Sequence, residues 1–189
     1  MKEDILNSYD KVSLEYVGNS NSLHKLGLES KRLEDAASKQ ILEVLGLDGY
    51  EVIYTSGNAE SFSTIISNVK GKVWTDNEEV KNICLKMGIS VSDDMDDVYF
   101  VSTLNERNFF GKVNHIDLKL GNKYENLSKF DFITIEDDIP IFGVLLKKKN
   151  IEILPLINGG KSSTKYRSGT AATPLIVSFA KMIKLKYKK

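Results

Sequence analysis

The chain has few of the residues that mark several classes of protein. Its 189 residues include one cysteine, Cys84, together with three prolines and two histidines. A single cysteine excludes an internal disulfide and fits a reducing compartment, so we expect a cytoplasmic protein. No apolar run is long enough to cross a bilayer and no signal peptide opens the chain, so we expect no membrane partner.

The chain also lacks an excess of charge of either sign. Lysine plus arginine and aspartate plus glutamate both number 26, which gives a formal net charge of zero. Nucleic-acid binding depends on neutralising phosphates, so no nucleic-acid partner is expected. The acidic turn at residues 93–97 lacks oxygen ligands at calcium-site spacing, so no metal site is predicted. The basic run Lys147–Lys149 and the basic tail are interpreted as solvated faces.

Hydrophobic periodicity predicts alternating helices and strands in the first half of the chain. The second half shows strand patterns that follow one another after a polar loop, with a last helix near Pro174. Ser22 or Ser30 is a candidate cap for the first predicted helix. The predicted helices span residues 33–45, 59–69, 77–87 and 174–185, and the predicted strands span 50–54, 72–74, 89–91, 98–102, 132–135, 141–146 and 151–155.

This order of elements predicts an α/β fold. Strands that alternate with helices form a mainly parallel sheet covered by helices, joined by right-handed crossovers. The later strands lack intervening helices, so we expect an antiparallel pair there. At this length, one domain spanning residues 1–189 is expected.

One strand-turn-helix segment, Val52–Ser61, predicts an anion site. Its turn directs backbone N–H groups to the end of the sheet, where a helix N-terminus favours negative charge. The alternative from spacing alone is a tight turn that binds nothing, because it contains a single glycine, Gly57. The segment is not a P-loop, since the lysine and spacing of that motif are absent.

Four segments resemble the cysteine desulfurases, which belong to the class V aminotransferase family of fold-type I pyridoxal phosphate (PLP) enzymes. Thr55-Ser56-Gly57 with Glu60-Ser61 resembles the family's phosphate-binding turn. Residues 19–37, 154–160 and 166–170 resemble its opening motif, its Pro-Leu-x-x-Gly-Gly motif and its Arg-Ser-Gly-Thr motif. The resemblance implies a three-layer α/β/α large domain with a mainly parallel sheet, reduced, and without the small C-terminal domain.

The resemblance also implies a vestigial cofactor site. Asn105 takes the place of the family's ring-stacking histidine, and Thr170 matches a residue that reaches the neighbouring subunit's phosphate. Arg167 matches the arginine that holds a substrate carboxylate, although we expect a structural salt bridge here. The remaining implied cofactor contacts are Thr55, Ser56, Gly57, Asn58 and Ala59.

The Schiff-base lysine of the family is missing. The family's Ser-x-His-Lys run falls on Glu136, Asp138 and Ile139 here, and isoleucine cannot form a Schiff base. Two carboxylates near the phosphate pocket would repel a dianion, and Ala59 replaces a phosphate-binding threonine. We therefore predict no cofactor and no catalytic residue, with Lys147 and Lys161 kept open as substitute lysines.

Other family parts are expected to be missing. The stretch that carries the aspartate paired with the pyridine nitrogen is interpreted as deleted, and so is the domain with the mobile catalytic cysteine. Cys84 is predicted to be a buried apolar residue. His24 is predicted to hydrogen-bond within a loop and His115 to lie at the surface.

These departures predict a degenerate, non-catalytic desulfurase-like protein. It would act by protein association, as a homodimer or with a full-length desulfurase, because a reduced domain exposes apolar surface. One alternative is a PLP-binding enzyme with a relocated lysine. Others are a module that binds an anion such as a phosphometabolite, or a decayed product without a selected role.

Overall fold

The computed structural model describes residues 2–105, 111–136, 142–160, 162 and 164–187. The chain divides into two compact units, one made of Met1–Gly49 with Ile157–Lys189 and the other of Tyr50–Leu156. We call them the helical unit and the sheet unit. One domain over residues 1–189 stays a prediction.

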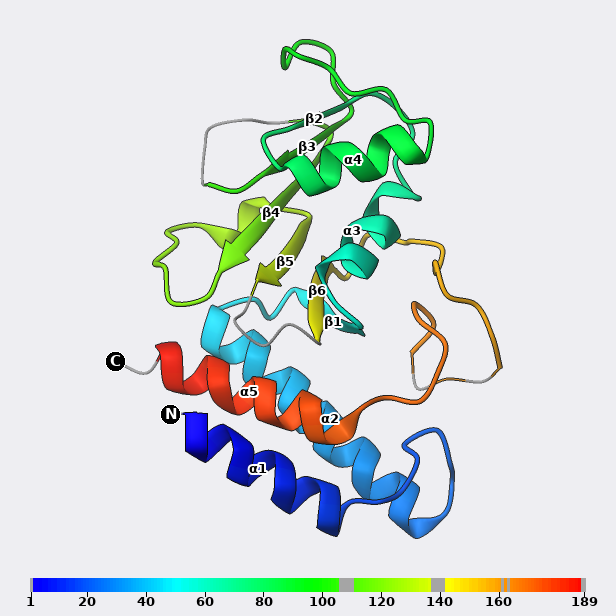
Figure 1. Ribbon diagram of the computed structural model, residues 1–189, viewed down its shortest axis with the longest axis vertical. Helices are drawn as coiled ribbons and strands as arrows, with labels where there is room; N and C mark the ends of the chain where they lie inside the picture. The colour runs from blue at the N-terminus through cyan, green and yellow to red at the C-terminus, as the bar shows by residue number, and fades with distance from the viewer. Residues whose placement is uncertain (1, 106–110, 137–141, 161, 163, 188–189) are drawn as a thin grey trace. The chain divides into compact units, whose positions relative to one another are not determined.

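The sheet unit contains a single sheet among its described residues, in the order β1-β6-β5-β4-β3-β2 (Figure 1). The pairs β2–β3, β3–β4 and β4–β5 are parallel, whereas β6 runs antiparallel to both β5 and β1. All strands except β6 therefore point the same way, which confirms the mainly parallel sheet and the antiparallel pair. The strands are β1 (Tyr50–Thr55), β2 (Val73–Thr75), β3 (Phe100–Thr103), β4 (Val113–Lys119), β5 (Phe132–Glu136) and β6 (Gly143–Lys148).

Two helices of the sheet unit pack beside its strands. Helix α3 (Asn58–Ile66) contacts β1, β5 and β6, while α4 (Glu78–Lys86) contacts β2 and α3. Phe62, Ile65 and Ile66 of α3 are almost fully buried, so this helix carries much of the core. Asn77 caps α4 because its Oδ1 accepts from the N–H groups of Glu79 and Val80, at 2.9 and 3.3 Å. A 3₁₀ turn, η1 (Leu127–Lys129), precedes β5.

The helical unit is built from α1 (Lys2–Glu15), α2 (Lys25–Leu45) and α5 (Thr173–Tyr187). Both α1 and α2 pack against α5. Its core contains Ile41 of α2 with Ile176, Phe179 and Ile183 of α5. None of the described helices is both long and apolar enough to cross a membrane.

The cap of α2 differs from the prediction. The Nδ1 atom of His24, and neither Ser22 nor Ser30, accepts from the N–H of Gly27 at 3.2 Å. This confirms the prediction that His24 hydrogen-bonds locally. The helix ends as predicted at Gly46, whose left-handed backbone (φ 68°) favours glycine.

Four other elements differ from the prediction. Residues 151–155 form no strand, and residues 89–91 contribute only an isolated bridge between Val91 and Val73. Helix α1 was not predicted. Strand β4 was interpreted as polar loop because Asn114, His115 and Asp117 interrupt its apolar pattern, yet all three are buried.

Candidate functional site

The parallel strands of the sheet unit direct their carboxyl ends to one edge of the sheet, which we call the carboxyl edge. In α/β sheets, ligands bind in the loops beyond this edge. The turn after β1 and the loop after β3, which contains Asn105, both lie there. The sheet thus places two of the predicted site segments at the same edge.

The turn between β1 and α3 is held together by its own side chains. The hydroxyl of Thr55 lies 2.8 Å from the hydroxyl of Ser61 and donates to the Gly57 carbonyl at 3.1 Å. The N–H of Ser56 donates to Oε2 of Glu60 at 2.9 Å. The first residue of β6, Gly143, approaches so closely that a Cβ there would collide with Thr55 Oγ1 and the Gly57 backbone.

This turn keeps donors for an anion and also carries a negative charge. The first backbone bond of α3 runs from Ser61 N to Gly57 O at 3.2 Å. The N–H groups of Asn58 and Ala59 precede it, so they have no acceptor within the helix. The Glu60 carboxylate accepts from the Ser56 N–H, so it would compete with an incoming anion for that donor.

The loop after β3 is anchored by the loop after β2. Asp76 accepts from the Leu104 N–H at 2.8 Å and from the Thr103 hydroxyl at 3.3 Å. The N–H of Asn105 donates to Thr103 Oγ1 at 3.2 Å, and the Asn105 side chain is exposed. Asn105 is therefore held at the carboxyl edge by its backbone.

Arg167 and Thr170 belong to the helical unit. The side-chain amide of Asn19 donates to the Thr170 hydroxyl at 3.3 Å, and that of Asn21 donates to the Gly169 carbonyl at 3.2 Å. The opening motif and the Arg-Ser-Gly-Thr motif thus meet, although Asn19 and Thr170 are 151 positions apart in the chain. A salt bridge for Arg167 stays a prediction.

The positions that replace the family's Ser-x-His-Lys run are described in part. Glu136 is the last residue of β5, where its Cα pairs with that of Lys119. Asp138 and Ile139 lie outside the described residues, as does Lys161. Glu136 therefore occupies the predicted place at the carboxyl edge, and its role stays a prediction.

Lys147 is not part of a solvated basic turn, because its side chain is 0% exposed. Its Nζ lies 2.8 Å from Glu51 Oε2 and donates to the carbonyls of Ile151 and Lys148 at 2.6 and 3.0 Å. Lys147 pairs with Glu51 near the start of β1, whereas the turn predicted to bind an anion follows the end of β1. With a rise of about 3.3 Å per residue, roughly 13 Å of strand separates the two positions. Lys147 therefore does not replace the Schiff-base lysine at that turn.

His115 is not a surface residue. It is 1% exposed in β4, and burial lowers its pKa to about 3. Its Nδ1 lies 2.9 Å from Ser102 Oγ and its Nε2 lies 2.9 Å from Thr134 Oγ1. The Thr134 hydroxyl donates to Asp117 Oδ1 at 2.6 Å.

We call Ser102, His115, Thr134 and Asp117 the buried relay. Sequence reasoning missed it because its members come from three strands, one of which was not predicted. Ser102 pairs with His115, and Asp117 pairs with Thr134, in the register of β3, β4 and β5. Phe62 of α3 lies edge-on to the His115 ring at a centroid distance of 5.7 Å, so the relay faces α3.

Cys84 is fully buried in α4, as predicted. Burial raises the pKa of its thiol to about 11. A thiol with a raised pKa is a poor nucleophile at neutral pH. Among the described residues, no group of three or more histidine, cysteine, aspartate or glutamate side chains could hold a metal ion.

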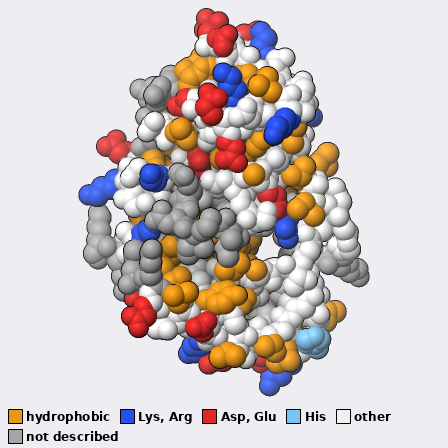
Figure 2. All heavy atoms as spheres, viewed as in Figure 1, with side chains coloured by type: hydrophobic (Ala, Val, Ile, Leu, Met, Phe, Trp, Pro, Cys, Tyr) orange, Lys and Arg blue, Asp and Glu red, His pale blue; other side chains and the backbone are white. Residues whose placement is uncertain are grey.

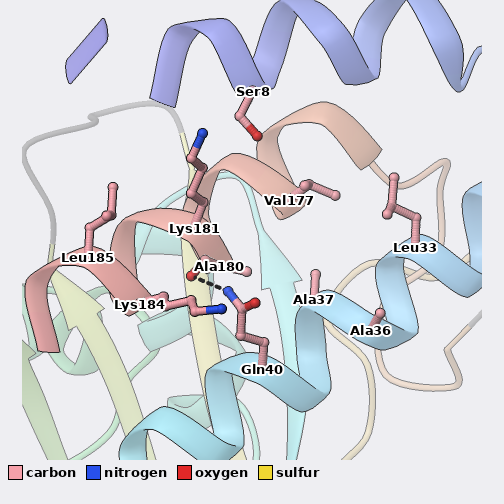
Figure 3. A pocket seen from close by; sticks show the side chains of 10 residues that line it. All are labelled: Ser8, Leu33, Ala36, Ala37, Gln40, Val177, Ala180, Lys181, Lys184 and Leu185. Atoms are coloured by element: carbon pink, nitrogen blue, oxygen red, sulfur yellow. Dashed lines mark hydrogen bonds between the residues drawn. The ribbon is translucent and has the colours of Figure 1, made fainter. Parts of the chain in front are cut away.

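The helical unit contains a hollow of about 420 Å³ between α1, α2 and α5 (Figure 3). Small and apolar side chains from α2 and α5 line it, with Ser8 from α1. Gln40 at its wall donates to the Ala180 carbonyl at 2.8 Å. Lys181 and Lys184 also line it, and no carboxylate does.

Comparisons with known proteins point to one fold. The structure matches a NifS-like protein with a TM-score of 0.81 at 21% identity, covering 97% of this chain and 66% of that chain. It also matches a NifS-like protein from Rickettsia africae with a TM-score of 0.82 at 20% identity, over 97% and 65% of the two chains. The fold is that of fold-type I PLP-dependent enzymes, as predicted.

Sequence comparisons agree with this fold. The family model Aminotransferase class-V matches residues 1–87. A NifS/IcsS protein homolog from Lactobacillus delbrueckii subsp. bulgaricus is 39% identical over 83 residues, which is 44% of this chain and 21% of that protein. Cysteine desulfurase IscS from Methanosarcina thermophila is 23% identical over 98% of this chain and 59% of its own length.

The chain matches the class V aminotransferase family model over residues 1–87 and is similar to cysteine desulfurases in sequence and fold, which confirms the resemblance of its motifs. It spans at most about three fifths of the length of these two curated relatives, 21% of one and 59% of the other.

The match to this family overturns one prediction. The sequence led us to expect no cofactor, whereas the family is PLP-dependent. The prediction relied on residues 136–139, and it gave too little weight to the turn after β1.

The carboxyl edge fits parts of PLP. The Asn58 and Ala59 N–H groups suit its phosphate. The Asp117 carboxylate, near the end of β4, suits a protonated ring nitrogen. PLP would supply an electron sink for amino-acid chemistry when bound. The lysine that should hold it covalently is replaced by Ile139 in the sequence.

Proposed function

We propose that this chain is a non-catalytic desulfurase-like protein that acts by associating with other protein chains, either a second copy of itself or a full-length desulfurase. A cytoplasmic location belongs to the same proposal, supported by the single cysteine. The observation that carries the association is an apolar surface in the first part of the helical unit.

This apolar surface lies within residues 6–28, where seven large hydrophobic side chains are exposed. Leu14 is 81% exposed and Leu23 is 89% exposed. Figure 2 shows hydrophobic side chains exposed over the helices of this unit. We call the set the N-terminal apolar surface: Leu6, Tyr9, Leu14, Val17, Leu23, Leu26 and Leu28.

Clustered apolar side chains of this kind mark protein interfaces. Covering a leucine side chain stabilises a complex by about 1.5–3 kcal/mol when it becomes fully buried. The hollow beside α1 in Figure 3 offers a recess for an apolar side chain of the partner. These features together support association through the helical unit.

The non-catalytic part of the proposal is supported by the sequence at the Schiff-base position. Ile139 has no amino group, and Lys147 is paired with Glu51 away from the carboxyl edge. Neither position 139 nor Lys147 can therefore supply the lysine for the family's covalent link to PLP.

Sedimentation velocity tests the association. We expect the purified protein to form a dimer or to co-sediment with a full-length desulfurase, and the double variant Leu6→Gln/Leu14→Gln to remain monomeric. Leu85→Gln is the matched control, because Leu85 is 60% exposed on α4 of the sheet unit. Monomers under all conditions, or equal weakening by Leu85→Gln, would contradict the proposal.

A second candidate is a PLP-dependent enzyme with a lysine other than Lys147. The N–H groups of Asn58 and Ala59, which have no acceptor within α3, and the Asp117 carboxylate near the end of β4 favour it. Release of sulfide from cysteine by the purified protein with added PLP would establish this candidate in place of the first.

A further inference from the structure

The buried relay has a direction that follows from counting its protons. Thr134 has one hydroxyl proton, and it donates that proton to Asp117 Oδ1 at 2.6 Å. Asp117 is the acceptor in this bond, so the single hydroxyl proton of Thr134 is used there. The Thr134 oxygen must therefore accept from its other partner, Nε2 of His115, at 2.9 Å.

The same count fixes the tautomer of His115. Burial lowers the pKa of His115 to about 3, so the ring is neutral at physiological pH and carries one proton. With that proton on Nε2, the Nδ1 atom is an acceptor, and Ser102 must donate to it at 2.9 Å. Every donor of the relay then points from Ser102 toward Asp117.

The surroundings hold this arrangement in place. Ser102, His115 and Thr134 are at most 1% exposed and Asp117 is 7% exposed. The His115 ring lies between Phe62, edge-on at 5.7 Å, and Phe100, parallel at 6.2 Å. Among the residues that these contacts place around His115 from α3, β3 and β5, none is charged, and Asp117 on its own strand is the ionisable group of the relay.

We propose that Thr134 and His115 are positioning residues, forming with Ser102 a one-directional hydrogen-bond chain that fixes the Asp117 carboxylate near the carboxyl edge. Asp117 is the terminal acceptor of the chain and sets its direction. This inference does not depend on the proposed association, because all four residues belong to the sheet unit.

The tautomer of His115 reports the direction of the chain and is measurable by ¹⁵N NMR of the side-chain nitrogens. The sequence has only two histidines, and a His24→Asn variant assigns the spectrum because asparagine is also a good helix cap. We expect the wild-type His115 ring to carry its proton on Nε2 and to show no titration between pH 5 and 8. A proton on Nδ1 would overturn the proposal.

Three variants separate this role from simple packing. In Asp117→Leu the terminal acceptor is lost, Thr134 can turn its proton to Nε2, and the His115 proton should move to Nδ1. Thr134→Val should remove the preference for Nε2, whereas Thr134→Ser should keep it. Ser102→Ala should leave the proton on Nε2, because the choice is made at the Asp117 end.

The position of the His115 proton in the variants tests whether Asp117 sets the direction of the chain. If His115 keeps its proton on Nε2 in Asp117→Leu, Asp117 does not set the direction and the proposal fails. If Ser102→Ala moves the proton, the direction is set at the other end and the proposal fails as well. Should Thr134→Val not fold, Asp117→Leu and the wild-type spectrum still decide.

Discussion

The two units differ in how they treat buried polar side chains. In the sheet unit, Ser102, His115 and Lys147 are buried and all hydrogen-bonded. In the helical unit, the buried hydroxyls of Ser30 and Ser178 have no hydrogen-bond partner among the described residues. The same unit exposes the N-terminal apolar surface. Among the described residues, the named buried side chains of the sheet unit are hydrogen-bonded and two of the helical unit are not, and the helical unit carries the surface that we propose binds other chains.

Lowering the pH should reduce the free energy of unfolding more than any other change, because the buried His115 of the sheet unit must then be protonated. The pKa of His115 is about 3 in the folded protein and about 6.5 when unfolded, so folding favours the neutral ring. Its contribution is complete above pH 6.5 and is lost as the pH falls to 3 and below, by roughly 5 kcal/mol in total.

Urea unfolding followed by Trp74 fluorescence at pH 7, 5 and 3.5 measures this loss. A His115→Gln variant should lose less stability over the same range, because glutamine does not titrate. Parallel pH profiles for the two proteins would contradict a buried neutral His115.

Removing the partner of Lys147 should have the next largest effect. Glu51→Ala leaves a fully buried ammonium without its carboxylate, which we expect to cost about 3 kcal/mol of unfolding free energy. The double variant Glu51→Ala/Lys147→Met should recover much of this loss, because the charge is gone. Urea midpoints that are equal for wild type and Glu51→Ala would show that the ion pair adds nothing.

Two buried serines compare the units directly. Ser102 and Ser30 are both 0% exposed, but only Ser102 has a hydrogen-bond partner. Ser102→Ala should cost about 1–3 kcal/mol, because it leaves Nδ1 of His115 without its donor. Ser30→Ala should be neutral or stabilising by a few tenths of a kcal/mol, because alanine favours the helix. Equal losses of unfolding free energy in the two variants, measured by urea unfolding, would contradict this difference between the units.

The smallest effect concerns Glu34 in α2. Glu34 is 4% exposed and accepts from the Thr173 hydroxyl at 2.6 Å, and burial raises its pKa. Its raised pKa means that Glu34 stabilises the fold in acid and that this stability is lost as the pH rises. Glu34→Gln keeps an acceptor for Thr173 and should stabilise the protein by about 1 kcal/mol at pH 7. Thermal unfolding should show no gain at pH 4, and a loss at pH 7 would contradict this account.

The sequence predicted those parts of the fold that depend on local signals. The turn after β1, the start of α4 near residue 77 and the Gly46 end of α2 depend on residues close together in the chain. The segment Val52–Ser61 was predicted to turn at the end of the sheet, and the turn after β1 lies there.

What could not be predicted depends on partners distant in the chain. Strand β4 was not predicted because it contains the polar residues His115 and Asp117. Such residues can be buried in a strand only when side chains of other strands form hydrogen bonds with them. Lys147 lies in a run of three lysines that suggested solvent exposure, but Glu51 on β1 and a carbonyl of the following loop accept from it. Neither acceptor can be identified until the strands are paired.

Borohydride reduction of the purified protein after incubation with PLP tests most directly whether a lysine of this chain holds PLP covalently. We expect reduction to leave no chromophore on the chain, because Ile139 stands at the Schiff-base position. A chromophore fixed by reduction, mapped to one lysine by peptide analysis, would contradict this expectation and name the residue that took over.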